Sequence, residues 1–185
     1  TATFAQMRKV FEGTHGQVEE CRLLTSYRSS PEITAMFTSL LEPDEQLRLT
    51  SVHRGGVAPV VREFAADDVD GYVSELRRIA EEARGEEGLT AIVAENDPRC
   101  GWLSKQLGDR VEVLGKDSDL PREGVVLLPL RVAKGLEFDH VVIPDAQAEV
   151  YPDTPLARRR MYTAISRAMH RVTVLSQGAM TSLLA

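Results

Sequence analysis

Five arginines near the end of the sequence are the residues best suited to bind phosphate. Arg158, Arg159, Arg160, Arg167 and Arg171 lie in residues 156–171, which contain no acidic residue. An arginine presents a planar fork of N–H donors, and one held at a domain edge can stabilise the charge on a phosphoryl group in transfer. Apolar residues at helical spacing predict a helix over 156–169, with Arg160 and Arg167 on one azimuth away from the apolar stripe. A basic, solvated helix face is the alternative interpretation.

Two further segments carry side chains that suit a nucleotide. Tyr27 offers a flat ring on which a base could stack, a contact worth roughly 1–3 kcal/mol, and Arg28 beside it offers donors for phosphate. Lys134 supplies a positive charge, Gly135 permits a tight turn, and Glu137 can accept hydrogen bonds from the two hydroxyls of a ribose. Each segment also has a purely structural interpretation. Tyr27 and Arg28 could be a packing residue beside a solvated charge, and residues 134–137 could be an ordinary turn between strands with solvated charges.

Composition restricts the classes of protein. The formal charge of −6 argues against a surface made entirely for wrapping nucleic acid. Cys21 and Cys100 stand far apart without a paired spacing, which predicts reduced thiols in the cytoplasm. The four histidines show no metal-ligand spacing, and no apolar run reaches the roughly 20 residues that span a bilayer. We therefore expect a cytoplasmic protein with no metal ligands of its own and no membrane segment.

Helical and strand patterns alternate along the whole chain. The strand patterns are largely continuous apolar runs, which are typical of a parallel sheet covered on both faces. Asp97 is the expected N-cap of one helix, and Pro98 its first residue. We predict a single α/β domain over 1–185, with residues 43–58 as the one plausible internal linker. The expected helices cover 3–12, a segment from Pro31 to Leu41, 68–84, 97–107 and 156–169, with a short one closing the chain; the expected strands cover 21–24, 60–65, 90–94, 111–114, 125–128, 140–143 and 171–175.

In order and separation, the three candidate segments resemble motifs of the C-terminal motor domain of UvrD/Rep-type helicases of superfamily 1. Residues 24–30 (LTSYRSS) are similar to motif IV, 133–138 (AKGLEF) match the core of motif V, and 158–168 (RRRMYTAISRA) are similar to motif VI. The resemblance covers essentially the whole chain. It implies a three-layer RecA-like fold of the P-loop NTPase type, with a mostly parallel sheet and helices on both faces.

The resemblance also implies roles for single residues. Tyr27 would stack on the adenine of ATP, Glu137 would hold the ribose, and Gly135 would shape the loop that carries it. Arg28 and Arg167 would reach the γ-phosphate, with Arg167 as the catalytic arginine finger. The chain contains neither a GxxxxGK[ST] phosphate loop nor an acidic magnesium motif. Mg²⁺ and most of the triphosphate would therefore be bound by a first RecA-like domain of the same parent protein, of which this chain would be a fragment.

Two departures leave the working partner open between DNA and RNA polymerase. Pro129 and Arg131 stand where UvrD and Rep carry a threonine and a DNA-contacting histidine, so only Arg131 and Lys134 are candidates for nucleic-acid contact. Pro129 and the segment from 167 to 171 look more like HelD, a relative that works on bacterial RNA polymerase. The short connection before residue 125 fits HelD or other compact relatives, which lack the large accessory domain of UvrD and Rep. A catalytically inert α/β binding module is a third interpretation.

Overall fold

The computed structural model describes residues 25–26, 29–41, 50–51 and 57–184. The predicted helix over 3–12 and the predicted strand over 21–24 lie outside these residues, as do Tyr27 and Arg28. Two short strands, β1 (Thr25–Ser26) and β2 (Thr50–Ser51), pair in parallel and stand apart from the main sheet. The segment expected to be a linker thus contains one of these strands.

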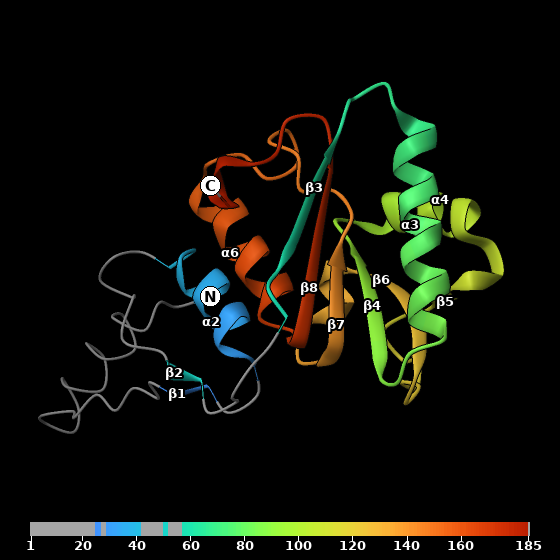
Figure 1. The fold of residues 1–185 in the computed structure, drawn as a ribbon, viewed down its shortest axis with the longest axis horizontal. Coiled ribbons are helices and arrows are strands. Elements are labelled where there is room, and N and C mark those ends of the chain that lie inside the picture. Colours follow the sequence, from blue (N-terminus) through green and yellow to red (C-terminus); the bar gives the residue numbers. More distant parts are fainter. Residues whose placement is uncertain (1–24, 27–28, 42–49, 52–56, 185) are drawn as a thin grey trace, which may run out of the picture.

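A six-stranded, wholly parallel sheet forms the centre of the described part of the chain (Figure 1). Its strands, in spatial order, are β3 (Val60–Phe64), β8 (Ala168–Gln177), β7 (Phe138–Ile143), β4 (Leu89–Ala94), β6 (Gly124–Pro129) and β5 (Glu112–Val113). The helices in the crossovers are α3 (Val69–Arg84), α4 (Asp97–Leu107) with the 3₁₀ turn Gly108–Arg110, α5 (Leu130–Ala133) and α6 (Pro155–Ile165). The helix α2 (Pro31–Thr38) precedes β3, and the 3₁₀ turn Ser182–Leu184 follows β8.

Helices cover both faces of the sheet, so the chain has three layers. The buried side chains of α2, α5 and α6 join one hydrophobic cluster, and those of α3 and α4 join a second cluster on the opposite face. The central strand β4 is buried along its whole length and alternates between the two clusters, with Ala91 and Val93 in the first and Ile92 and Ala94 in the second. The predicted α/β architecture, with helices on both faces of a parallel sheet, is confirmed.

Side-chain caps fix the beginnings of the long crossover helices. The Asp68 carboxylate accepts a hydrogen bond of 3.0 Å from the Gly71 amide and so begins α3. The prediction that Asp97 caps α4 was wrong by one residue. The Asn96 side chain accepts the Arg99 amide at 2.9 Å, and Asp97 is the first residue inside the helix.

The helix α6 ends at Ile165, four residues earlier than predicted. Pairing with β7 causes this early end, because Ala168 already lies opposite Phe138 and begins β8. Of the predicted apolar stripe, Met161, Ala164 and Ile165 are buried from the helix, whereas Ala168 and Val172 are buried from the strand. Arg167 therefore lies in the connection after α6, and the prediction that it shares a helix face with Arg160 was wrong.

The pairing of β7 with β8 contains an irregularity. Phe138 pairs with Ala168, but His140 pairs with Arg171, so β8 holds one residue more than β7 between the two pairs. This is the arrangement of a β-bulge. The alternation of β8 side chains between the two faces of the sheet is therefore shifted by one residue between Ala168 and Arg171.

A buried ion pair fastens α3 and α4 to the end of β7. Asp145 is 1% exposed, and its carboxylate accepts hydrogen bonds from the Arg99 guanidinium at 2.8–3.1 Å. The Tyr72 hydroxyl, from α3, lies 3.0 Å from the same carboxylate and 2.9 Å from the Pro144 carbonyl oxygen. Burial and the Asp145 charge both raise the pKa of Tyr72, so its hydroxyl remains a donor.

We expect Asp145→Ala to destabilise the fold by about 3 kcal/mol, because it leaves the largely buried Arg99 without its counter-charge. Urea unfolding followed by circular dichroism measures this loss. The matched control is Glu81→Ala, which breaks the exposed pair with Arg110 and should cost less than about 1 kcal/mol. Equal losses in the two variants would contradict a structural role for the buried pair.

Candidate functional site

Three segments that are far apart in the sequence meet at the amino-terminal edge of β7 and β8. The Phe138 amide donates a hydrogen bond of 2.9 Å to the Arg167 carbonyl oxygen. The Ser29 hydroxyl donates to the Ala168 carbonyl oxygen at 2.8 Å, and the Ser30 amide donates to the Met169 carbonyl oxygen at 3.0 Å. The beginning of α2, the loop before β7 and the connection before β8 are thus joined through their backbones.

The Arg167 guanidinium is held loosely within this edge. Its Nη1 lies 3.5 Å from the Leu136 carbonyl oxygen, and its Nη2 lies 3.3 Å from the Ser166 hydroxyl. Its Nε is buried and has no hydrogen-bond partner among the described residues. A buried donor without a partner costs free energy, roughly 1–3 kcal/mol. The half-buried side chain therefore keeps donor capacity that an acceptor such as a phosphate oxygen could use.

The loop of residues 134–137 leads Glu137 to the edge at which Phe138 bonds Arg167. It follows α5, and the Leu136 amide donates to the Ala133 carbonyl oxygen at 3.1 Å. Gly135 has a φ of +80°, the left-handed region in which a residue with a side chain is strained. Glu137 is half-buried and directly precedes Phe138, the residue bonded to the Arg167 carbonyl. The turn at Gly135 thus brings Glu137 to the edge occupied by Arg167.

The structure does not bring all the candidate residues together. Tyr27 and Arg28 lie outside the described residues, and of their neighbours Ser29 is bonded beside Arg167. Arg131 lies at the opposite edge, where it follows the end of β6 and bonds the Asp97 carboxylate at 2.6 and 2.8 Å. These hydrogen bonds lower the pKa of Asp97. Lys134 is exposed.

The arginine cluster singled out in the sequence lines a basic groove along α6 that the sequence did not predict. The groove encloses about 880 Å³, and its charged lining residues are all cations: Lys134, Arg158, Arg159 and Arg160. Apolar lining comes from Leu40, Leu41 and Leu130, together with Leu156 and Tyr162 of α6. The absence of acidic residues over 156–171 was the available signal, but the contributions of α2 and α5 depend on tertiary packing.

The described part of the chain shows neither a metal site nor a membrane-spanning helix. No group of three or more histidine, cysteine, aspartate or glutamate side chains there has the arrangement of a metal site. No helix in those ranges is both long and apolar enough to cross a membrane.

Comparisons with known proteins show that the chain is similar to a helicase C-terminal domain. The family model of the UvrD-like helicase C-terminal domain matches residues 124–175, which include the loop of 134–137 and Arg167. The solved C-terminal domain of a possible DNA helicase from Lactobacillus plantarum WCFS1 is 31% identical, with a TM-score of 0.70 over 86% of this chain and 92% of that one. The C-terminal domain of the DEAD-box protein Dbp5 is 14% identical, with a TM-score of 0.44 over 63% and 75% of the two chains. No curated protein sequence matches the chain.

We expect Gly135→Ala to destabilise the fold by about 1–2 kcal/mol, the cost of forcing a side chain into the left-handed region. An added Cβ would meet no atom within 4 Å, so the loss would be conformational and not steric. Gly101→Ala, inside α4 and equally open, is the control and should stabilise by about 0.5–1 kcal/mol. Thermal unfolding of both variants tests the sign of each change. A Gly135→Ala protein as stable as the parent would show that the turn is not a constraint.

Proposed function

Because the chain belongs to the UvrD-like helicase C-terminal domain family, we propose that it is the C-terminal half of an ATP-dependent DNA helicase or translocase. The observation that carries the proposal is the meeting of the Ser29, Phe138 and Arg167 segments at one edge of the sheet. Sequence reasoning had assigned adenine, ribose and γ-phosphate contacts to these same three segments. Their junction supports a common location for the proposed contacts.

In the proposed site, Arg167 acts on the γ-phosphate as an arginine finger. Its unpartnered Nε and its weak contact with Leu136 leave donors available for phosphate oxygens. Glu137 holds the ribose hydroxyls, and the turn at Gly135 sets its position. Tyr27 stacks on the adenine, and Arg28 joins Arg167 at the phosphate. All four residues would face a nucleotide from one edge of the sheet.

The proposed ATP site is shared between two domains. The sequence contains no phosphate loop or acidic magnesium motif, so these residues supply a base platform, a ribose acceptor and arginines only. We propose that residues 1–185 form one RecA-like domain and that a first RecA-like domain of the same parent protein binds Mg²⁺ and most of the triphosphate. Hydrolysis would then occur in the cytoplasm, where ATP is available, across the cleft between the two domains.

The proposed nucleic-acid contacts involve Lys134 and Arg131. Lys134 lies in the basic groove along α6, whose charged lining residues are all cations and would attract phosphate, although Arg158 among them is paired with Asp153 at 3.0 Å. Arg131 is paired with Asp97, but both side chains are 58% exposed. An exposed ion pair contributes little free energy, so a DNA phosphate could replace Asp97 as the partner of Arg131.

The short connection between β5 and β6 favours a second candidate, a HelD-like motor that acts on RNA polymerase. Only residues 114–123 join these strands, which leaves no room there for the large accessory domain of UvrD and Rep. ATPase assays of the parent protein with single-stranded DNA or with RNA polymerase would separate the candidates. Stimulation by polymerase but not by DNA would favour the HelD-like motor.

We expect Arg167→Ala in the intact parent protein to lower ATPase turnover by about 10³-fold, as for other arginine fingers. ATP affinity should change much less, because the finger acts mainly on charge that develops in the transition state. Arg167→Lys should restore little, since an ammonium group lacks the planar fork of donors. Steady-state kinetics together with nucleotide binding measures both effects.

Arg160→Ala is the matched control within the same segment. Arg160 lies over the Tyr151 ring and donates to the Glu95 carbonyl oxygen at 3.3 Å, away from the contacts of Arg167. Its loss should leave turnover within a few-fold of the parent. Equal effects of the two substitutions would contradict the finger role, and two harmless substitutions would favour an inert binding module.

We expect the 185-residue chain alone to show no ATP turnover and to bind ATP only near millimolar Kd. The physical reason is the absence of a phosphate loop, whose backbone amides supply most of the triphosphate affinity in such motors. Calorimetric titration and a phosphate-release assay on the purified chain test this. Turnover above that of an Arg167→Ala chain prepared in parallel would overturn the shared-site proposal.

A further inference from the structure

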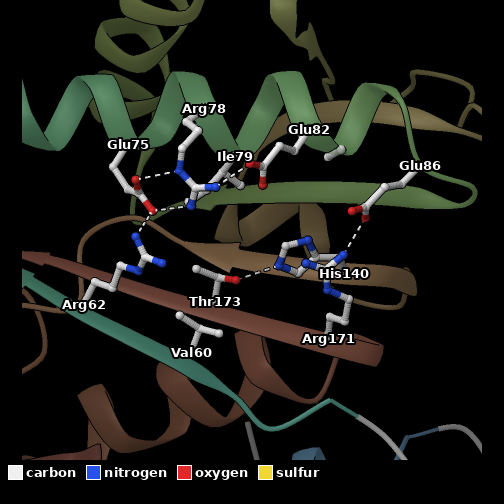
Figure 2. Close-up of a pocket in the computed structure, with 11 residues that line it drawn as sticks. Val60, Arg62, Glu75, Arg78, Ile79, Glu82, Glu86, His140, Arg171 and Thr173 are labelled. Carbon is white, nitrogen blue, oxygen red and sulfur yellow. Dashed lines mark hydrogen bonds and ion pairs between the residues drawn. The ribbon is translucent and has the colours of Figure 1, made fainter.

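A small polar pocket of about 220 Å³ lies between α3 and the strands β3, β8 and β7 (Figure 2). Its floor consists of His140 and Thr173, with Val60 beside them, and one wall is formed by α3. The opposite face of the sheet is covered by α6, the helix that leads to Arg167. The pocket is therefore separate from the edge proposed to bind ATP.

His140 leaves one ring nitrogen of this floor unsatisfied. The side chain is 5% exposed, and its Nε2 lies 2.8 Å from the Thr173 hydroxyl. Its Nδ1 is buried and has no hydrogen-bond partner among the described residues. Buried polar atoms are nearly always paired, and an unpaired one costs roughly 1–3 kcal/mol. The pocket thus contains an unmet hydrogen-bonding requirement at its floor.

The charged groups around the pocket differ in how firmly they are held. Glu75 is only 11% exposed and is bonded by both Arg62 and Arg78, and Arg78 also bonds Glu82 (Figure 2). All three guanidinium nitrogens of Arg78 are used in these contacts. Arg171 in contrast bonds Glu86 through Nη1, and the two side chains are 41% and 50% exposed. Such a pair contributes little, so Arg171 can exchange its partner at low cost.

Three arginines and three glutamates line the pocket, so its formal charges balance, and Arg171 is the charged group that acts on His140 at the floor. Burial, and after it the charge of Arg171, lowers the pKa of His140 to about 4. The imidazole is therefore neutral near pH 7, with one proton to place on either nitrogen. If the Thr173 hydroxyl donates to Nε2, the proton stays on Nδ1, which becomes a donor.

We propose that this pocket binds a small oxyanion, a phosphate or a carboxylate, between the Arg171 guanidinium and the Nδ1–H of His140. The ligand supplies the acceptor that Nδ1 lacks, and it displaces Glu86 from Arg171. Arg62, which has donors beyond its bond to Glu75, contributes charge at the other end of the pocket. The site is independent of the proposed nucleotide contacts, since none of its lining residues belongs to them.

Inorganic phosphate is the probe, titrated into the 185-residue chain at constant ionic strength with chloride as the reference anion. Binding is followed by the ¹⁵N resonances of the His140 ring and by the backbone amides of β8. We expect saturable shifts at His140 and Arg171. Succinate titrated in the same way distinguishes a carboxylate site from one that selects phosphate, and either ligand supports an oxyanion site.

Two substitutions give opposite expectations. Arg171→Gln should weaken phosphate binding at least tenfold, whereas Glu86→Gln should tighten it several-fold because Arg171 loses its competing carboxylate. Arg110→Gln, on an exposed pair with Glu81 outside the pocket, is the control and should change nothing. All three side chains are substantially exposed, so amide spectra should retain the dispersion of the folded chain.

Three results would overturn the proposal. The first is an absence of saturation at His140 with either anion. The second is unchanged affinity in both Arg171→Gln and Glu86→Gln. The third is a set of shifts confined to residues 134–138 and 166–168, which would place the anion at the proposed nucleotide edge. If the Arg171→Gln chain unfolds, the phosphate affinity of the Glu86→Gln chain alone tests the proposal. None of these results bears on the ATPase assays of the parent protein, so the two proposals fail separately.

Discussion

The parallel pairing of β7 with β8 is the interaction on which the other features of the domain depend. It holds together two strands that enter the sheet from different helices, α5 and α6. Its first backbone bond, from the Phe138 amide to the Arg167 carbonyl, ends α6 and begins β8. Backbone bonding of this kind is insensitive to side-chain identity, so the edge can be retained while the surrounding residues vary. The position of Arg167 is a consequence of strand pairing and not of helix geometry.

The same pairing creates two chemically different surfaces. On the α6 face, Met161 and Phe138 belong to a continuous apolar cluster beneath the edge proposed to bind the nucleotide. On the α3 face, His140 and Thr173 interrupt the apolar cluster with polar groups. Buried polar groups reduce stability unless they are satisfied, and residues retained at such a cost are typical of binding sites. The two faces of one strand pair therefore differ in character: one is continuously apolar, and the other contains the polar groups of the proposed oxyanion pocket.

Much of the architecture could be predicted from local patterns. Alternating strand and helix signals indicated the parallel sheet, and Pro31 and Pro98 marked real helix beginnings.

The errors occurred where tertiary contacts compete with local preference. Residues 166–169 continue a helical pattern, but pairing with β7 draws Ala168 into a strand. Asn96 and Asp97 are both good caps, and the turn after β4 selects the first. Side-chain chemistry indicated Arg167 and Glu137, whereas the pocket at His140 combines residues from four elements and has no local signature.

The bulge between Phe138 and His140 separates the two ends of β8 in a way that affects how the domain could diverge. Arg167 directly precedes β8, and if the strand continued regularly through it, strict alternation would tie its side-chain direction to that of Arg171. The extra residue breaks this tie, so the orientation of one arginine does not dictate that of the other. A lineage could lengthen or shorten this segment by one residue and redirect Arg167, while the register from Arg171 onward, and with it the core, stayed intact. The bulge is thus a position at which the edge proposed to bind the nucleotide could change while the register of the sheet is retained.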